Sequence, residues 1–409
     1  MTEQQDDGEG TVRMTRHTNE TARLRRRAFL GGAGATLVLV TGGGVWRAVG
    51  QGVFGAGTGP AFEPWDTWRA AGATGPLALV PAAILAANAH NTQPWLFRVG
   101  RARIDLFADT RRDIGAVDPF RREMYLSLGC ALENLLLTAQ AAGYGYRLTL
   151  GPDRSNPTHA ARVDLSPGQR DVSPLYAAIP HRHTNRFAYD TSRPLPRATL
   201  DVLTALGDNE PAVKVFWFAT GAQRRAVGGL LVAAGRAMNG DTEQAYDNNA
   251  RWVRQDQDAI ERHRDGLTLD DLGLSGVTLL AAKMLPPPSL ESAGTAWLQV
   301  LGQQARTAAA FGILAVRDDR DDDHRMRAGR LWQRMHLWGT AHGLAMQPMN
   351  QAHERADREA QQGGAPTFGH AVAALIDDAR WRGVFSFRAG YPTMEAQASP
   401  RRAVTDVLI

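Results

Sequence analysis

The chain has 409 residues, of which 44% are hydrophobic and 22% are charged. These fractions are those of an ordinary globular protein, and the length allows an enzyme of two or three domains. The net charge of +4 is small and spread along the chain, so we expect no nucleic acid as a direct partner. Cys130 is the single cysteine, which excludes an intrachain disulfide, a cysteine-based zinc site and an iron–sulfur cluster. Its apolar neighbours predict a buried thiol that acts as a small hydrophobic group.

The N-terminal residues have the layout of a twin-arginine export signal. Three arginines at 25–27 precede the pair Phe29-Leu30, and a glycine-rich apolar run follows at 31–40. An uncleaved membrane anchor stays open, because no clean Ala-x-Ala cleavage site follows, although glycines at 42–44 interrupt the roughly 20 apolar residues that a spanning helix needs. We therefore predict a signal and linker at residues 1–59, the twin-arginine translocase as a partner, and a periplasmic, extracytoplasmic or membrane-anchored location. This machinery moves folded proteins, so the signal also favours a bound cofactor.

Two helical stretches in the remaining chain are similar in composition. The first is predicted at 124–142 and the second at 326–342, and each is followed by a glycine. At a fixed offset Gly129 aligns with Gly329 and Glu133 with Gln333, although two core helices can match in this way by chance. The acidic run at 318–323 is interpreted as the N-terminal end of the second helix. We predict two halves, at 60–175 and 176–409, with a lid insertion near 244–290 that ends in the proline-rich loop 285–288.

Short strand patterns surround these helices. Residues 96–99 and 103–108 predict a hairpin, and further strands are expected at 146–150, 161–165, 213–218 and 384–388. The predicted fold class is α+β. No strand leads through a Gly-x-Gly-x-x-Gly turn into a helix, which argues against a Rossmann dinucleotide site.

Three polar segments are candidates for a cofactor site. In the first, Asn88, His90, Asn91 and Gln93 precede Pro94-Trp95 and the hairpin. A flavin ring and its ribityl chain need neutral donors and acceptors of this kind, because their polar atoms are otherwise buried without partners. A capped turn that leads into the hairpin is the alternative interpretation.

The second segment combines Arg182 and Arg186 with His183 and Thr184 between them. Guanidinium groups bind phosphate through paired donors, and a hydroxyl with neighbouring N–H groups completes the shell, so the segment predicts an anion site. A metal site at His181 and His183 is disfavoured, because few carboxylates lie nearby. The third segment contains Arg401 and Arg402 near the C-terminus, which are ordinary solvated charges unless they meet the second segment in space.

Taken together and in this order, the segments resemble the nitroreductase family, in particular its Acg-like branch of single-chain, internally duplicated members. The resemblance covers residues 62–407 and is carried by residues 90–95, 182–186, 344–351, 390–392 and 399–402. It implies a nitroreductase-like FMN-binding fold in which two fused halves form a pseudo-dimer within one chain, with FMN between them.

The resemblance also implies residue roles. Phosphate and ribityl oxygens would be held by the six residues Arg182, His183, Thr184, Arg186, Arg401 and Arg402. The opposite half would contribute Asn88, His90, Asn91 and Gln93, and Gln347 and Met349 would pass near the ring. Many relatives have Pro-Ser-Ser where this chain has Ala87-Asn88-Ala89, so two hydroxyls are missing there. The first half lacks an Arg-x-Ser-x-Arg segment near 62–83, which implies that one of the two pseudo-symmetric sites is occupied.

The implied function is an FMN-dependent oxidoreductase that uses NAD(P)H to reduce nitroaromatic or quinone-like small-molecule acceptors. Because the cofactor carries the chemistry, no catalytic residue and no metal is predicted. The pseudo-dimer is intrachain, so a monomer is expected. One alternative is a flavin-sequestering protein without turnover, in which the lid covers the ring. Another is a cofactor-free, membrane-tethered structural protein, which leaves the arginine segments unexplained.

Overall fold

The computed structural model describes residues 56–69, 74–274 and 276–409. The predicted export signal lies outside these residues. The first half forms a four-stranded antiparallel sheet in the order β1-β2-β4-β3, with a long helix, α5, between β2 and β3 in the chain. Its elements are β1 (Trp95–Val99), β2 (Arg103–Ala108), α5 (Arg122–Ala141), β3 (Tyr144–Leu150) and β4 (His159–Pro167). The strands predicted in this half, including the hairpin, are confirmed.

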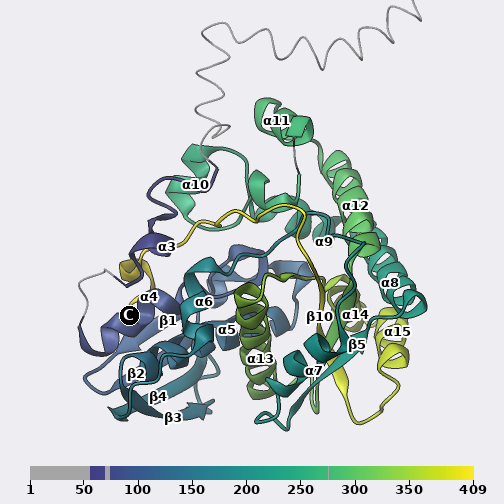
Figure 1. Cartoon of the computed structure of the whole chain (residues 1–409). Coiled ribbons are helices and arrows are strands. Elements are labelled where there is room, and N and C mark those ends of the chain that lie inside the picture. The colour runs from purple at the N-terminus through teal and green to yellow at the C-terminus, as the bar shows by residue number, and fades with distance from the viewer. Residues whose placement is uncertain (1–55, 70–73, 275) are drawn as a thin grey trace, which may run out of the picture.

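The second half repeats this topology. Its sheet has the order β5-β8-β10-β9, and its long helix, α13, again follows the second strand in the chain. The elements are β5 (Val213–Phe218), β8 (Ala310–Val316), α13 (Asp322–Ala341), β9 (Ala345–Pro348) and β10 (Arg382–Gly390). The two sheets lie on either side of α5 and α13 (Figure 1). Matching strands therefore occupy matching places, as expected of two fused halves.

Shorter helices connect these elements. Near the first half lie α3 (Glu63–Thr67) and α4 (Val80–Ala83), whereas α6 (Pro174–Ala178) packs against both long helices and α7 (Arg197–Ala205) lies beside β5. Between β5 and β8 lie α8 (Gly221–Asn239), α9 (Thr242–Tyr246), β6 (Val253–Arg254), α10 (Gln257–His263), β7 (Leu267–Thr268), α11 (Gly276–Met284) and α12 (Leu290–Thr307), and between β9 and β10 lie α14 (Gln351–Gln361) and α15 (Thr367–Ile376). Within the described ranges, no helix is long and apolar enough to cross a membrane.

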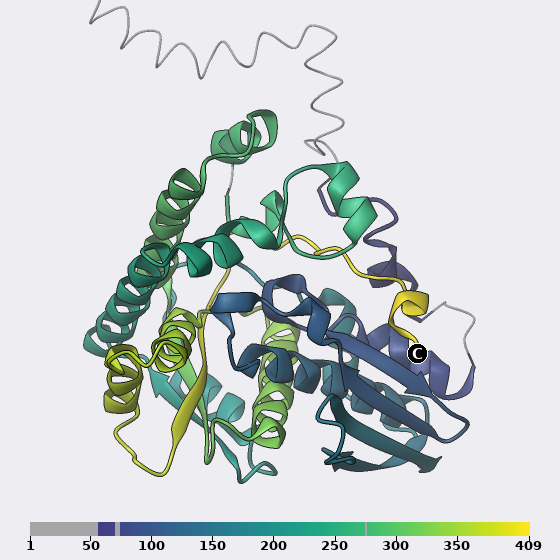
Figure 2. The ribbon, with the colours of Figure 1, turned by 180° about the vertical axis from the view of Figure 1, so that it is seen from behind.

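The segment between α9 and α12 stands above the two sheets. Helices α10 and α11 are farthest from the strands, and α8 and α12 run along one side of the molecule (Figures 1 and 2). Lys283 of α11 forms an ion pair of 2.8 Å with Asp270, which ties the helix to the chain below it. The loop predicted at 285–288 separates α11 from α12.

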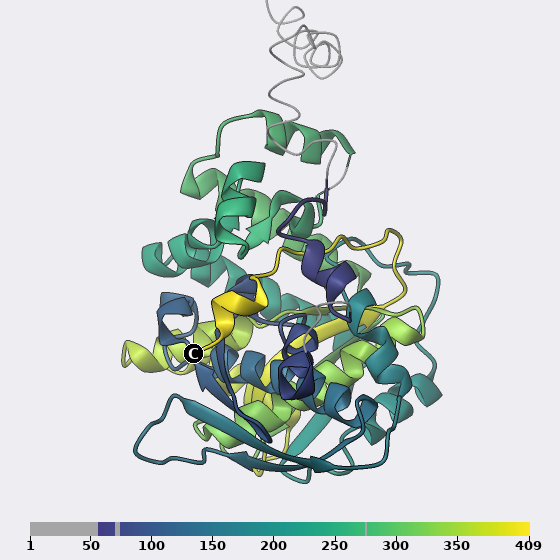
Figure 3. The same cartoon turned by 90° about the vertical axis from the view of Figure 1, so that its left-hand side faces the viewer.

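The C-terminal segment leaves the second half and returns to the first. Leu408 forms a parallel bridge with Phe97 of β1, and the Ile409 amide donates to the Phe97 carbonyl at 3.0 Å. On the way, the Arg401 amide donates to the Ala61 carbonyl at 2.7 Å, so the last residues lie beside the start of the described chain (Figure 3). The two halves are therefore interlocked, and residues 399–402 are brought to the first half.

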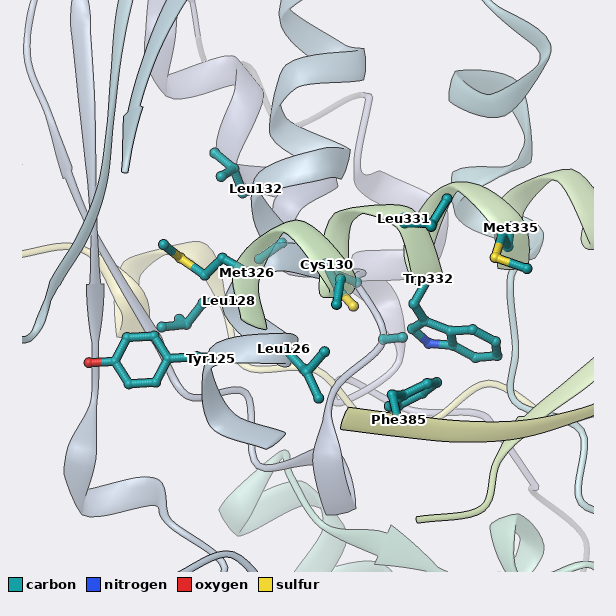
Figure 4. Close-up of a cluster of buried hydrophobic side chains, with 14 of the residues drawn as sticks. Tyr125, Leu126, Leu128, Cys130, Leu132, Met326, Leu331, Trp332, Met335 and Phe385 are labelled. Carbon is teal, nitrogen blue, oxygen red and sulfur yellow. The ribbon is translucent and has the colours of Figure 1, made fainter. Parts of the chain in front are cut away.

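Helices α5 and α13 cross at two glycines. A Cβ atom on Gly129 would lie 2.1 Å from the Met326 carbonyl oxygen, and one on Gly329 would lie 2.0 Å from the Leu126 carbonyl oxygen. Adding 200 to the numbers of Gly129 and Leu126 gives Gly329 and Met326, so each contact is the counterpart of the other. The first and last residues of α5 and α13 are also 200 residues apart. The crossing is thus pseudo-two-fold, and it needs glycine because the backbones touch. Large side chains of both helices pack around it, with Cys130 beside them (Figure 4).

Both long helices begin earlier than predicted. The Asp118 carboxylate accepts from the Glu123 and Met124 amides at 2.9 and 3.1 Å, and Asp321 caps α13 in the same way. These caps add a first turn that the apolar pattern does not contain. The acidic run at 318–323 therefore lies at the start of α13, as interpreted.

Two strands of the four-stranded sheets, β8 and β9, were not predicted, and neither was the short pair β6 and β7. Every residue of β8 is buried, so its sequence shows no alternation between polar and apolar positions. Strand β9 has four residues and ends in a proline. Short or wholly apolar runs of this kind lack the two-residue alternation of polar and apolar side chains by which a strand is recognised in a sequence.

Candidate functional site

A cavity of about 400 Å³ lies between the two long helices and the segment between α9 and α12, residues 247–274 and 276–289, which we call the lid segment after the predicted insertion. This volume is within the range of small-molecule and cofactor sites. Both halves and the lid contribute to its wall. Polar lining residues include Asn88, His90, Glu123, Ser127, Thr184, Arg186, Asn248, Gln304, Gln347, Asn350 and Glu354.

The floor of the cavity is apolar. Leu126 of α5, Trp332 of α13 and Phe385 of β10 line it, and the rings of Trp332 and Phe385 are 4.8 Å apart between centroids. Figure 4 shows the three side chains next to one another where the two halves meet. The floor is thus built from both halves and offers an apolar surface to a ligand, with the Trp332 and Phe385 rings tilted by 49° to each other.

The roof comes from the lid segment and from α12. Five leucines and Trp297 of α12 contribute to it; the leucines are Leu267, Leu269, Leu272, Leu274 and Leu285. A roof of this composition favours a largely apolar ligand.

The first predicted segment has an unusual backbone. His90, Asn91 and Gln93 have φ values of 46°, 53° and 52°, in the left-handed region that non-glycine residues rarely adopt. The Asn88 side chain holds the turn, because its Oδ1 accepts from the Gln93 amide at 2.8 Å and its Nδ2 donates to the Ala86 carbonyl at 3.1 Å. Strained backbone of this kind is concentrated at functional sites, where surrounding contacts fix it.

The four predicted residues of this segment separate into two groups. Asn88 and His90 line the cavity, whereas Asn91 and Gln93 are absent from its described lining. Asn91 Nδ2 donates to the Gly266 and Pro400 carbonyls at 3.0 and 2.9 Å, and Gln93 Nε2 donates to the Arg264 carbonyl at 2.8 Å. Their carboxamides therefore join the first half to the lid segment and to the C-terminal segment.

His90 is held neutral by its surroundings. Burial lowers the pKa of its imidazole below the ordinary value, and the side chain is hydrogen-bonded to Asn248 of the lid. A neutral imidazole at the cavity wall has one donor and one acceptor nitrogen. It is therefore suited to neutral polar atoms of a ligand.

The second predicted segment also divides. Thr184 and Arg186 line the cavity, and Arg186 Nη1 donates to the Asp271 carbonyl at 3.1 Å. Arg182 lies behind the wall with 2% of its surface exposed, and its Nη2 donates to the Leu85 carbonyl at 3.0 Å. His183 packs edge-on against Trp65 with ring centroids 4.5 Å apart, and burial followed by the nearby Arg182 charge lowers its pKa to about 3.

The adjacent arginines of the third segment have different surroundings. Arg401 is 1% exposed, donates to Asn91 Oδ1 and Ser399 Oγ, and lies over the Trp65 ring. Its charge is close enough to act on both Arg182 and His183. Arg402 instead donates to the Gln93 and Asp406 carbonyls. The Arg401 side chain therefore lies close to Arg182 and His183 of the second segment. The Arg402 side chain instead attaches the C-terminal segment to the first half.

The resulting group of Arg182, Arg186 and Arg401 contains buried positive charge without a matching negative charge. Over residues 56–69, 74–274 and 276–409, no carboxylate forms an ion pair with any of the three. The nearest, Asp271, accepts from the amide and hydroxyl of Thr268. Nε of Arg182, Nε of Arg401 and Nδ1 of His183 have no hydrogen-bond partner in the described part of the chain. Buried charges and donors of this kind need a partner, and a phosphate group would supply one.

A chain of carboxamides orients the middle of the site. Arg388 is fully buried and its Nε donates to Gln347 Oε1 at 2.7 Å. Gln347 Nε2 then donates to Gln304 Oε1 at 3.1 Å, and Gln304 Nε2 donates to the Arg186 carbonyl at 3.0 Å. Arg388 thereby fixes which end of Gln347 is donor and which is acceptor. Met349, also predicted near the ring, is fully buried in a separate apolar cluster that includes Val372 and Ile376.

No protein-family model matches the chain. It is 30% identical over 339 residues to a Mycobacterium tuberculosis H37Rv protein provisionally named NAD(P)H nitroreductase Rv3131, which spans 80% of this chain and 88% of that relative. The chain belongs to the nitroreductase family. A shorter match, 33% identical over 88 residues, links it to the Acg protein of the same organism, and covers 22% of this chain and 27% of that one.

Solved nitroreductases resemble the chain loosely. The FMN- and NADPH-dependent nitroreductase NfnB of a Sphingopyxis strain has a TM-score of 0.38 and 18% identity, over 57% of this chain and 97% of that one. NfnB from Mycobacterium smegmatis, solved in complex with NADPH, has a TM-score of 0.36 and 16% identity, over 57% and 96%. The family assignment therefore depends on the sequence relative.

Sequence reasoning missed part of this nitroreductase-family site. Gln304 and Arg388 carry no local signal, and neither does the carboxyl pair Glu123 and Glu354, which lines the cavity from α5 and α14. Cys130 is buried as predicted, and burial raises the pKa of its thiol. Among the residues with described positions, no three His, Cys, Asp or Glu side chains are grouped as metal ligands.

Proposed function

We propose that the chain binds FMN in this cavity and acts as an NAD(P)H-dependent oxidoreductase. One observation carries the proposal: the buried Arg182 and Arg401 lie behind the cavity wall and the partly buried Arg186 lies in it, and none of the three has a carboxylate partner among the described residues. An unpaired buried guanidinium is costly, so its retention is understood if an anionic ligand completes it. FMN combines a phosphate with a neutral polar chain and a planar ring. These three parts match the arginines, the neutral polar wall and the apolar floor of the site.

The phosphate is assigned to the cationic group. Arg182, Arg186 and Arg401 would compensate its charge, with Thr184 and the free Nδ1 of His183 as further partners. Arg402 would act by holding the C-terminal segment in place. This division keeps five of the six residues that the sequence suggested for the phosphate and ribityl oxygens.

The ribityl chain and the ring are assigned to the neutral wall and the apolar floor. Asn88, His90 and Gln347 offer donors and acceptors, and Arg388 keeps the Gln347 carboxamide in one orientation. Leu126, Trp332 and Phe385 offer an apolar surface to the ring. When bound, FMN supplies hydride transfer between a nicotinamide donor and an acceptor.

Nitroaromatic or quinone-like acceptors fit this arrangement best. Both are flat and largely apolar, as the leucine-rich roof requires. The names of the relative and of the solved nitroreductases, which refer to NAD(P)H and FMN, support the same reaction class.

A second candidate function is flavin storage without turnover. The lid segment favours it, because several of its described residues line the cavity and one of them, Asn248, is hydrogen-bonded to His90 in the cavity wall. A lid that stays closed would hold FMN and keep NAD(P)H away.

An absorption experiment separates these functions. Purified protein, reconstituted with FMN, should be yellow, and NADPH should bleach it and a quinone should restore the colour. Flavin that stays oxidised in excess NADPH would favour storage. Protein that takes up no FMN would refute both functions.

We also propose export by the twin-arginine translocase and a monomeric state. The arginines at 25–27 and the apolar run support export, and the intrachain pairing of two equivalent halves supports a monomer. Replacement of the three arginines by lysine should retain a reporter fusion in the cytoplasm. Light scattering of the protein without its first 55 residues should give the mass of one chain.

A further inference from the structure

Two acidic side chains meet at the cavity wall, one from each half. Glu123 lies in the first turn of α5 and Glu354 in the first turn of α14, and both line the cavity although they are 6% and 4% exposed. The two carboxyl groups are close enough to interact directly. Two ionised carboxylates repel each other in a buried site, so the arrangement favours one proton between them.

Nearby cations do not neutralise the pair. Arg122 is the buried guanidinium beside it, and its Nε is taken by Asp357 at 2.8 Å. Its Nη1 donates to the Val384 carbonyl, which leaves Nη2 to reach Glu123 at 3.4 Å. Oε2 of Glu354 has no N–H or O–H donor from any described residue.

The other titratable groups packed around the pair increase the negative charge or are neutral. Asp118 is a further buried carboxyl, and Arg320 reaches Asp357 at 3.5 Å from a half-exposed position. Burial lowers the pKa values of His90 and His353, so neither adds a positive charge. Four buried carboxyls therefore share one buried arginine, and a proton shared by Glu123 and Glu354 leaves the pair with a single negative charge. In agreement, burial and the neighbouring Glu123 raise the pKa of Glu354 well above its ordinary value.

We infer that Glu123 and Glu354 form a proton-donating pair that delivers their shared proton to the oxygen of an acceptor in the cavity. This inference rests on the proposed function. Reduction of a quinone to a hydroquinone adds two electrons and two protons. A hydride from the reduced flavin supplies both electrons and one proton, and the pair supplies the second proton to the quinone oxygen. Both carboxylates are then ionised, and the pair regains its proton from water when the product leaves.

The surroundings explain why a built-in donor is useful. The roof and floor are apolar, so few water molecules reach an acceptor there. A positioned general acid contributes about 100-fold to 10,000-fold in rate. A nitro group has the same need, since its conversion to a nitroso group and water also takes one hydride and one further proton.

The test uses Glu354→Gln and Glu123→Gln in the FMN-loaded protein. Glutamine has the shape of a protonated carboxyl group, so the fold should be retained. Glu359→Gln is the matched control, because Glu359 is a buried carboxylate of the same helix that accepts from the Phe368 amide at 3.0 Å and lies away from the described lining. The flavin is reduced with dithionite, so that the result does not depend on the nicotinamide donor.

Reoxidation is then followed with two acceptors. Benzoquinone takes electrons and protons, whereas ferricyanide takes electrons alone. We expect both test variants to slow reoxidation by benzoquinone about 100-fold or more, with ferricyanide rates within about 3-fold of the parent protein. The control should match the parent protein with both acceptors. Equal slowing of both acceptors, or no slowing of either, would overturn the inference.

Infrared difference spectroscopy gives a readout that does not need turnover. At neutral pH the parent protein should show the C=O stretch of protonated carboxyl groups, and either test variant should lose the intensity of one such group, while the control and Asp118→Asn keep the component that the test variants lose. A parent protein without this band, or test variants with its full intensity, would overturn the shared proton. Protein that takes up no FMN would overturn the proposed function and the donor role together, whereas normal uptake with unchanged benzoquinone rates overturns the donor role alone.

Discussion

Replacing Arg182 by methionine should weaken FMN binding without destabilising the apo protein. Burial lowers the pKa of Arg182 to about 10, from an ordinary value above 12, which means that the buried charge costs the apo protein about 3 kcal/mol. Methionine removes this cost and keeps an unbranched side chain in place. It leaves the Leu85 carbonyl without its 3.0 Å hydrogen bond, which costs about 1–3 kcal/mol. The apo variant should therefore be as stable as the parent protein, or up to about 2 kcal/mol more stable.

The effect on FMN should have the opposite sign. If Arg182 compensates the phosphate, its loss leaves that charge without a partner and costs about 2–5 kcal/mol of binding, or about 30-fold to several thousandfold in Kd. Urea unfolding of the apo protein measures the stability, and quenching of flavin fluorescence measures the affinity.

A matched control is Arg325→Met. Arg325 is buried to a similar degree, but it donates to Asp322 Oδ1 at 2.8 Å and to the Phe120 carbonyl at 3.0 Å. Its loss should cost about 2–3 kcal/mol of stability and leave FMN affinity unchanged. If Arg182→Met is as destabilising as this control while FMN still binds normally, Arg182 is a structural residue and the phosphate assignment is wrong.

Three further substitutions test the fold and the site. Gly329→Ala should lower the free energy of unfolding in urea by about 3 kcal/mol or more, because the new Cβ would meet the Leu126 carbonyl. Gly229→Ala is the control, because Gly229 has open space around it, and it should stabilise α8 by up to about 1 kcal/mol. Equal effects of the two substitutions would contradict the close crossing of α5 and α13. Burial raises the pKa of Asp118 to about 7, so the folded protein binds a proton there more tightly than the unfolded chain, and stability should fall by up to about 4 kcal/mol as pH rises from about 4 to about 7. Asp118→Asn should flatten this slope in unfolding experiments at several pH values, and an unchanged slope would assign it to other groups. Arg388→Met should release Gln347 and weaken FMN binding by about 1–2 kcal/mol in the fluorescence titration, and unchanged affinity would show that the carboxamide chain does not position the ligand.

The elements with clear periodicity could be predicted from the sequence. The helices α5 and α13 carry apolar faces bounded by Gly143 and Gly343, and the alignment of Gly129 with Gly329 anticipated the place where they cross. The first turns of both helices depend on caps by Asp118 and Asp321, which the apolar pattern does not include. Strand β8 was missed because it is buried on both faces and shows no alternation.

For the site, local motifs indicated which residue types take part, but they did not indicate in which direction each side chain points. Arg401 and Arg402 are neighbours in an extended segment, where successive side chains point to opposite sides. The sequence suggested both as phosphate ligands, and the structure places Arg401 with Arg182 and Arg402 with Gln93. Glu123 and Glu354 are distant in the sequence and meet through tertiary packing, so no motif could have paired them.

The pseudo-symmetry of the fold does not extend to the chemistry of the site. The offset of 200 residues that relates α5 to α13 places Asp323 where the first half has Glu123, yet Asp323 is only partly buried and lies near Gly151, away from the described lining of the cavity. The arginine segment 182–186 likewise belongs to the second half, and the first half contributes Trp65 against His183. The crossing of the two long helices therefore places apolar floor residues from both halves side by side, whereas the cationic group and the carboxyl pair are each assembled once. Since a flavin and its acceptor need an anion site and a proton source in one cavity, a fused chain can specialise its halves in a way that two identical subunits cannot.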